Sequence, residues 1–340
     1  MSTTTGNEEE VDTLKLSSCH LVEVLADDSL LWTWSYPHLS PQLRTICTSK
    51  CNVILSQGVK SVREEEDGTT DKEGGFMMQG KNFHLDNLWF YVVFPVRPNG
   101  AKVSGSDNKA VPVKMVGVIV VAANFHKEMY ESVGNVLYLT YMKTGDASLV
   151  LQQFLSLVVE GNCSLPKKKV FTLDDHWLSA PYDNHQIKGE IILRFGLETI
   201  LIYTALQKRK RIVVYHYDID VLSNFTFSLP ALSNSPEVWK AIYPWIDLNE
   251  YELEFTKNND FYIMGCTVAG VESNLDLFDL FVNIPAAEIS VAPHAREHIS
   301  MNKTHKEMAT FMVQLASSET TEDEVVASIL KRNEEIKDKL

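Results

Sequence analysis

The sequence has no apolar run long enough to cross a bilayer and no surplus of positive charge. Its longest apolar stretch covers residues 115–123, whereas a transmembrane helix needs about 20 residues. The opening MSTTTGNEEEVD has no basic region followed by an apolar segment, so a secretory signal peptide is not expected. With a formal net charge of −14, the chain lacks the basic footprint that nucleic acids and anionic membranes select. We therefore expect a cytoplasmic protein with no transmembrane segment and no nucleic-acid partner.

The sequence contains few cysteines, and they form no recognisable disulfide or metal-binding pattern. The 340 residues contain five cysteines, and their odd number and irregular spacing argue against a set of disulfides. Cys47 and Cys51 form a C-x3-C pair, but no second pair follows, so we expect no zinc site there.

The usual signatures of cofactor binding and covalent catalysis are also missing. There is no G-x-x-x-x-G-K-[ST] loop, and the apolar run 212–215 is not followed by G-x-G-x-x-G. No G-x-S-x-G elbow accompanies the serines. We therefore expect no cofactor and no covalent catalysis.

One short motif leaves a zinc enzyme open as an alternative. His294, Glu297 and His298 match H-x-x-E-H, the order found in inverted zinc metallopeptidases. On a helix the two histidines would share one face, and Glu297 could orient a water. Because the pattern has only three fixed positions, a surface helix that carries histidines is the simpler interpretation.

Length and composition predict a chain of two lobes. A chain of 340 residues with 45% hydrophobic content can bury a large core and is long enough for two domains. The expected order is an acidic disordered tail over 1–13, a first lobe over 14–161 with flexible insertions near 61–80 and 99–109, a linker over 162–185, a second lobe over 186–318 and a closing helix over 319–340.

In the first lobe, apolar runs over 19–25 and 30–36 flank a turn and predict a hairpin. A helix is expected over 39–51, strands over 88–94 and 115–122, and then two helices. We expect those helices to end at Gly145 and Gly161, with Asp146 capping the second.

In the second lobe, strand candidates at 212–215, 261–264, 280–284 and 289–291 alternate with helices. This alternation predicts an α/β lobe with a partly parallel sheet.

The closing helix has an apolar seam that includes Val326, Ile329 and Ile336, and Thr321 with Glu324 fits a capping box at its start. The seam either packs on the chain's own lobe, which is the simpler interpretation, or docks on a partner coiled coil.

Several separated segments together resemble the DENN domain family. Residues 193–232 read LRFGLETILIYTALQKRKRIVVYHYDIDVLSNFTFSLPAL, which is similar to the helix–KRIVV–helix signature of the central DENN module. LWTWSYPHLSP at 31–41 and the helix pair ending at Gly161 resemble the upstream module. DLFVNI at 279–284 and APHAREHISMNKTHKEM at 292–308 resemble the segment that follows the central module. The likeness covers about residues 16–316 and points to the small single-module members.

The resemblance implies a bilobed fold, mixed α/β (α+β overall), with a longin-like N-terminal lobe and an α/β C-terminal lobe. It also implies nucleotide exchange on a Rab GTPase through binding alone, without acid–base catalysis. The small members are also associated with the Commander endosomal recycling complex through coiled-coil subunits. A non-catalytic scaffold is therefore the alternative, and recruitment to late endosomes is expected for either role.

Candidate partner-binding residues follow from where strands end. The carboxyl ends of strands in α/β sheets usually present the site, which singles out His216, Tyr217 and Asp218 after the strand 212–215. Tyr36, His38 and Gln42 come just after a strand of the first lobe.

Overall fold

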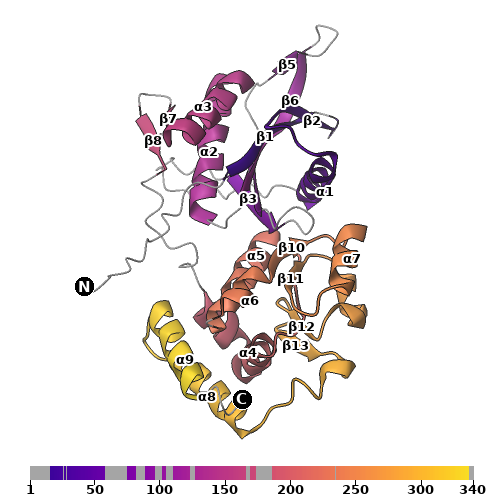
Figure 1. Cartoon of the computed structure of the whole chain (residues 1–340), viewed down its shortest axis with the longest axis vertical. Coiled ribbons are helices and arrows are strands. Elements are labelled where there is room, and N and C mark those ends of the chain that lie inside the picture. Colours follow the sequence, from indigo (N-terminus) through magenta and orange to yellow (C-terminus); the bar gives the residue numbers. More distant parts are fainter. Residues whose placement is uncertain are drawn as a thin grey trace, which may run out of the picture.

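A computed structural model of the chain describes residues 16–25, 27, 29–57, 75–81, 89–95, 102–104, 110–122, 127–165, 169–173, 186–233 and 235–336. We call 16–173 the first lobe and 186–336 the second lobe (Figure 1). The expected tail at 1–13 lies outside the described residues, as does much of the expected insertions and linker.

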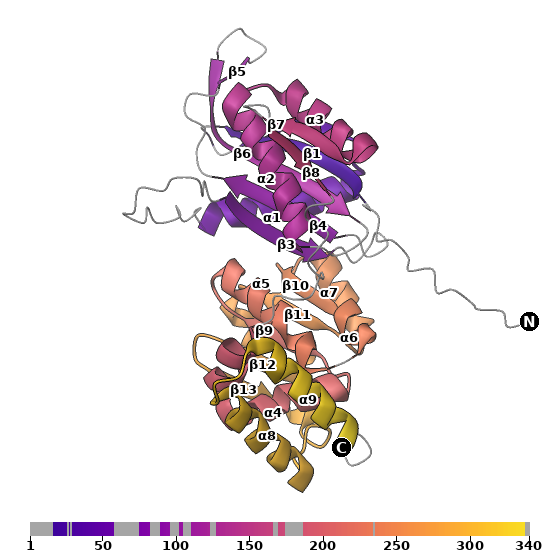
Figure 2. The same ribbon diagram turned by 90° about the vertical axis from the view of Figure 1, so that its left-hand side faces the viewer.

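The first lobe is built on an antiparallel sheet whose strands follow the order β2-β1-β6-β4-β3, with β5 paired to β6. Its strands are β1 (Leu16–Leu25), β2 (Leu30–Tyr36), β3 (Gly75–Lys81), β4 (Trp89–Pro95), β5 (Lys102–Ser104) and β6 (Ala110–Ala122). The helices are α1 (Pro41–Gln57), α2 (Lys127–Thr144) and α3 (Ala147–Glu160). Helices α2 and α3 cover one face of this sheet and α1 covers the other (Figures 1 and 2). Successive side chains of β1 point to opposite faces of the sheet. Leu21 packs towards α2 and α3, whereas Val22 belongs to the cluster around α1.

The caps of α3 form as the sequence predicts. The Asp146 carboxylate accepts the backbone N–H groups of Ser148 (2.8 Å) and Leu149 (3.3 Å). Gly161 ends the helix with φ of 71°, a conformation that favours glycine.

A bulge in the first hairpin decides where the tryptophans lie. Leu21 pairs with Trp34 and Val22 with Trp32, so Thr33 is left over between them. Trp34 packs towards α3 and donates its indole N–H to the carbonyl of Ala147 (3.0 Å). Trp32 packs on the other face, under the guanidinium of Arg44. Residues two apart in a regular strand share a face, so the bulge places both rings against helices.

The second lobe has a sheet of order β10-β11-β9-β12-β13, parallel except for the antiparallel edge strand β13. The strands are β9 (Ile212–Tyr215), β10 (Ile242–Ile246), β11 (Ile263–Cys266), β12 (Leu280–Asn283) and β13 (Glu288–Val291). The α-helices are α4 (Thr199–Gln207), α5 (Ile219–Ser228), α6 (Pro236–Lys240), α7 (Glu250–Lys257), α8 (Lys303–Ala316) and α9 (Glu322–Ile336). Shorter helical segments are the π-helical η2 (Ile187–Leu193) and the 3₁₀ segments η3 (Gly196–Glu198), η4 (Leu229–Leu232), η5 (Ala269–Ser273), η6 (Leu275–Leu277) and η7 (Pro293–Ala295).

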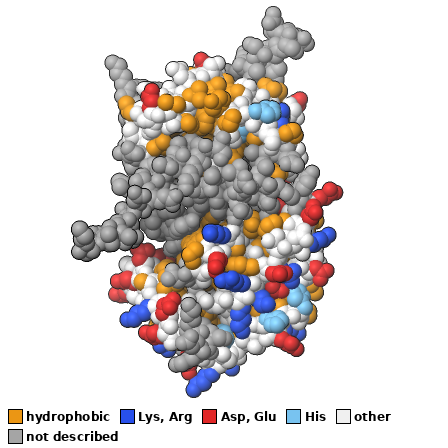
Figure 3. All heavy atoms as spheres, viewed as in Figure 1, with side chains coloured by type: hydrophobic (Ala, Val, Ile, Leu, Met, Phe, Trp, Pro, Cys, Tyr) orange, Lys and Arg blue, Asp and Glu red, His pale blue; other side chains and the backbone are white. Residues whose placement is uncertain are grey.

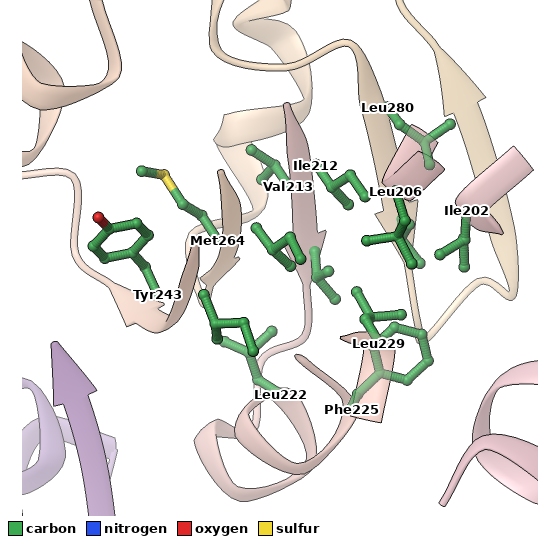
Figure 4. Close-up of a cluster of buried hydrophobic side chains, with 14 of the residues drawn as sticks. Ile202, Leu206, Ile212, Val213, Leu222, Phe225, Leu229, Tyr243, Met264 and Leu280 are labelled. Atoms are coloured by element: carbon green, nitrogen blue, oxygen red, sulfur yellow. The ribbon is translucent and has the colours of Figure 1, made fainter. Parts of the chain in front are cut away.

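The apolar core of the second lobe surrounds the central strand β9. Figure 4 shows Ile212 and Val213 of this strand gathered with Leu206 of α4 and with Leu222 and Phe225 of α5. Helices α4 and α5 lie on one side of the sheet and α7 on the other (Figure 1). The helix–strand–helix order predicted for 193–232 is therefore confirmed, and the chain has the expected mixed α/β fold with one antiparallel and one mostly parallel sheet.

Four segments correct the sequence predictions. Strand β3 lies at the end of the supposed insertion 61–80, and β5 lies within 99–109, because edge positions beside β4 and β6 accept them as hydrogen-bonded partners. Within the supposed linker 162–185, β7 (Asn162–Leu165) and β8 (Lys169–Thr172) form a hairpin, and its Cys163 and Phe171 are buried against the first lobe's core. Strand β10 is missing from the prediction because Pro244 interrupts its apolar run; as an edge strand with a register shift at that proline, it tolerates the missing N–H.

The closing helix α9 packs on its own lobe, which is the simpler of the two interpretations of its apolar seam and leaves the seam unavailable for docking. Its buried residues repeat at helical spacing and are Val325, Ile329, Asn333 and Ile336, while Val326 is partly buried against the same cluster. The hydroxyl of Tyr203 on α4 donates to Oδ1 of Asn333 (2.5 Å). The Thr321–Glu324 capping box is present, with backbone N–H groups donating to side-chain oxygens in both directions.

In the part of the chain that the structure describes, no helix combines the length and apolar character needed to traverse a bilayer.

Candidate functional site

The first candidate region is the carboxyl end of β9, where the sequence predicts His216, Tyr217 and Asp218. His216 is buried and accepts the backbone N–H of Asp218 at Nδ1 (2.9 Å). The Asp218 carboxylate caps α5 by accepting the N–H of Asp220 (3.0 Å). Both side chains therefore hold the turn between β9 and α5, whereas Tyr217 stacks on His216 and is 62% exposed.

Tyr217 is accompanied by two further exposed apolar side chains at the same edge of the sheet. Val221 lies in the first turn of α5 and Val268 follows β11. Strand β11 pairs with β9, and the His216 N–H donates to the carbonyl of Cys266 (3.3 Å), so the residues after both strands share this edge. We call Tyr217, Val221 and Val268 the carboxyl-edge patch. A ring and two branched side chains exposed together suit a protein interface, where aromatic residues are enriched.

The second predicted group lies at the end of β2 and in the chain that leads into α1. Tyr36 is 46% exposed and meets the ring of Phe154 on α3 edge-on, with 6.4 Å between ring centroids. His38 is exposed in the connection to α1, and Gln42 lies in the first turn of α1. These residues stand at the β2 edge of the first sheet, and the structure does not join them with His216 into one site.

The two lobes meet along β3 and α1 of the first lobe and β10, α5 and α7 of the second. The edge strand β3 of the first sheet lies beside the edge strand β10 of the second, and α5 also packs against β3 (Figures 1 and 2). Next to this boundary, α1 reaches the corner between β10 and α7. The contact there is polar and buried.

Lys50 of α1 is the centre of that contact. Its side chain is 1% exposed, and Nζ donates to Asp247 Oδ1 (3.0 Å) and to Glu252 Oε1 (2.8 Å). The same ammonium lies 4.0 Å from the centroid of the Trp245 ring. Ser49 adds a hydrogen bond from its hydroxyl to Asp247 Oδ2 (2.8 Å). We call Lys50, Asp247 and Glu252 the interlobe cluster.

Glu252 also caps its own helix. Its Oε2 accepts the backbone N–H groups of Asp247 (2.9 Å) and Asn249 (3.3 Å), and Asn249 Oδ1 accepts the N–H of Glu252 in return. Burial raises the pKa of Glu252 to about 7 despite the nearby ammonium. The pKa of Asp247 is held well below its usual range, because Lys50 and the surrounding hydrogen bonds outweigh its desolvation. One ammonium therefore pairs with two carboxylates, and the pKa of Glu252 is well above that of Asp247.

The zinc interpretation of the H-x-x-E-H motif does not fit the geometry. His294 lies in the 3₁₀ segment η7 and the following residues form turns, so the motif is not on an α-helix. Nε2 of His294 is instead 2.9 Å from Asp279 Oδ1, which also pairs with Arg211 (3.0 Å). Nowhere in the described ranges do three or more His, Cys, Asp or Glu side chains gather as a metal site would require. Cys47 and Cys51 are buried free thiols in the core around α1.

The interlobe cluster escaped the sequence analysis, although two signals for it are present. Lys50 stands between Cys47 and Cys51 on the inner face of α1, an unusual place for a lysine. Asn249 and Glu252 have the spacing of a capping box. Neither signal says that the lysine and the glutamate, about 200 residues apart, would meet.

Comparison with known proteins places the chain in a family. Residues 185–293 match the family described as Stabilization of polarity axis. The chain is 31% identical over 322 residues to DENN domain-containing protein 10 of Danio rerio, which covers 94% of this chain and 84% of that protein. It is 29% identical over 329 residues to the Homo sapiens protein of the same name (96% and 85%) and 21% identical over 324 residues to that of Dictyostelium discoideum (92% and 83%). The chain therefore belongs to the DENN domain-containing protein 10 family.

Proposed function

We propose that this protein is a guanine nucleotide exchange factor for a Rab GTPase and that it acts in the cytoplasm on endosomal membranes. Family membership carries the proposal, since the likeness to DENN domain-containing protein 10 extends over nearly the whole chain. DENN proteins as a family act on Rab GTPases by exchange.

Exchange of this kind needs binding and no chemical catalyst. The factor binds the GTPase more tightly when its nucleotide site is open than when it is closed, and this difference lowers the barrier to GDP release. A thousandfold acceleration requires about 4 kcal/mol of differential binding. A protein interface of ordinary size can supply that much.

The carboxyl-edge patch is the surface that we assign to the GTPase. It is apolar and aromatic, it stands where α/β sheets usually present a site, and its backbone is fixed by the Asp218 cap. Figure 3 shows acidic and basic side chains intermixed over the visible face of the second lobe, so this face carries no field of one sign.

Replacing Tyr217 with alanine tests this assignment. Tyr217 is 62% exposed, so its loss should leave the fold intact while it weakens binding to the nucleotide-free GTPase at least tenfold. Val159→Ala is the matched control, because Val159 is 80% exposed on α3 of the first lobe. Equal affinities for the two variants in calorimetric titration would refute the assignment.

The scaffold role in the Commander complex is not proposed. Its support in the sequence was the apolar seam on the closing helix. Ile329 and Ile336 of that seam are buried on the chain's own second lobe. Should exchange fail across Rab GTPases, binding to coiled-coil subunits becomes the role to measure.

A further inference from the structure

We propose that Lys50, Asp247 and Glu252 form a proton-sensitive latch that holds α1 of the first lobe to the β10–α7 corner of the second. This inference goes beyond the exchange function and does not depend on any partner. Its test therefore needs the purified chain alone.

The position of the cluster makes it a latch. Lys50 comes from the first lobe, both carboxylates come from the second, and all three side chains are nearly excluded from water. Removing one member of a buried ion pair leaves an uncompensated charge, so disrupting this contact costs far more than disrupting an exposed pair between the same groups. The two polar bonds of Lys50 and the bond from Ser49 therefore tie α1 to the opposite lobe.

The charges in the cluster do not balance. One ammonium faces two carboxylates, which leaves a buried net charge of −1 when all three groups are ionised. Both carboxylates accept from the same Lys50 ammonium, Asp247 at 3.0 Å and Glu252 at 2.8 Å, so they share one buried counter-charge. A proton taken up by Glu252 would make the cluster neutral while Lys50 keeps its ion pair with Asp247.

The other titratable groups around the cluster do not compete for this proton. Cys47 of α1 and Cys266 of β11 face it, and burial raises the pKa of their thiols to about 12 and about 11. Both stay neutral near physiological pH. The remaining neighbours, Ser49, Trp245 and Asn249, do not titrate in this range.

The direction of the pH effect follows from linkage. Glu252 has a pKa of about 7 in the folded chain, above the ordinary value of 4.5 that it regains on unfolding. Between these values the folded chain binds more protons than the unfolded chain, so stability falls as pH rises through that window. The folded chain with the latch formed is thus more stable at pH 6 than at pH 8, and protonation of Glu252 should change the unfolding equilibrium constant about tenfold between them.

Buried histidines act in the opposite direction. Burial lowers the pKa of His20 to about 4 and also lowers that of His305, and a base with a depressed pKa costs stability as pH falls through its ordinary value towards the depressed one. This contribution is common to all variants with unchanged histidines, so a comparison of variants isolates the latch.

The test is urea unfolding of the full chain at pH 6.0 and pH 8.0, followed by circular dichroism. Glu252→Gln replaces the titrating carboxyl with an amide that neither gains nor loses a proton in this pH range, so it should remove the roughly tenfold pH difference whatever its effect on overall stability. Glu335→Gln, on the exposed pair with Arg332, is the control and should keep that difference. Lys50→Met should unfold at lower urea than Lys303→Met, whose lysine is 92% exposed. An unchanged pH difference in Glu252→Gln, or equal stability of the two lysine variants, would overturn the proposal.

Discussion

Lys50 owes its place to three side chains from the other lobe. A lysine is rarely buried unless it is paired, and the helix face around it is otherwise apolar, with Cys47 and Cys51 at 0% exposure. Asp247, Glu252 and the Trp245 ring together replace the water that the ammonium loses. The pairing explains how a charged side chain can lie on the buried face of α1.

Gly265 is the second residue whose identity the packing requires. A Cβ atom at this position of β11 would lie 2.1 Å from the carbonyl oxygen of Pro244 in β10 and 2.9 Å from the side chain of Leu222. The backbones of the two strands approach too closely at this point for any side chain. The register between β10 and β11 is irregular around Pro244, and the close approach of the two backbones there leaves room only for glycine.

We therefore predict that Gly265→Ala destabilises the protein by about 3 kcal/mol or more, because backbone must move to admit the methyl group. Gly270→Ala provides the control, since no atom lies within 4 Å of its added Cβ, and its effect should stay within about 0.5 kcal/mol. Chemical denaturation of both variants measures the difference. Similar stabilities would show that β10 and β11 do not approach in this way.

At the scale of elements, α9 is an integral part of the second lobe. It is joined to the lobe by a buried apolar face, by the Tyr203–Asn333 hydrogen bond and by Glu322, which accepts the backbone N–H of Lys188 (3.0 Å) at the start of η2. A helix held at its start, near its end and along its apolar face is expected to unfold with its lobe.

Replacing Ile329 with alanine should cost about 2 to 4 kcal/mol, because Ile329 is fully buried and its loss leaves a cavity. Lys331→Ala, at an exposed position of the same helix, should change the unfolding free energy by less than about 0.5 kcal/mol. Urea titration compares the two. If Ile329→Ala unfolds like the control, then α9 does not depend on this face.

Elements with strong local signals could be predicted from the sequence. The hairpin β1–β2, the capped helix α3 and the order α4–β9–α5 all follow from apolar periodicity and caps. Strands β3, β5, β7 and β10 could not be found this way, because each is short, polar or interrupted by proline and exists through pairing with a distant partner. Local patterns contain no information about such pairing.

The candidate site shows the same division. The turn His216–Asp218 was placed correctly at the end of β9, but two of its three side chains support the turn and only Tyr217 is exposed. The interlobe cluster was not predicted, since it depends on how α1 meets β10 and α7. Contacts between lobes arise only in the folded chain.

At the scale of the whole molecule, the two lobes share a core. Val22, Val24, Ile119 and Val121 of the first sheet join α1 and the second lobe in one contiguous apolar cluster. The latch lies beside this shared core, and β3 lies beside β10 along the same boundary. We therefore expect the carboxyl-edge patch of the second lobe to keep a fixed position relative to the first lobe when a partner binds.

The release of a fluorescent GDP analogue from a panel of purified Rab GTPases, with and without the full-length chain, tests the proposed function most directly. An exchange factor should accelerate release from one or a few of them, by up to about a thousandfold, and Tyr217→Ala should reduce that acceleration. If the folded chain accelerates release from no Rab in a panel that includes the endosomal ones, the exchange function proposed for this protein is contradicted.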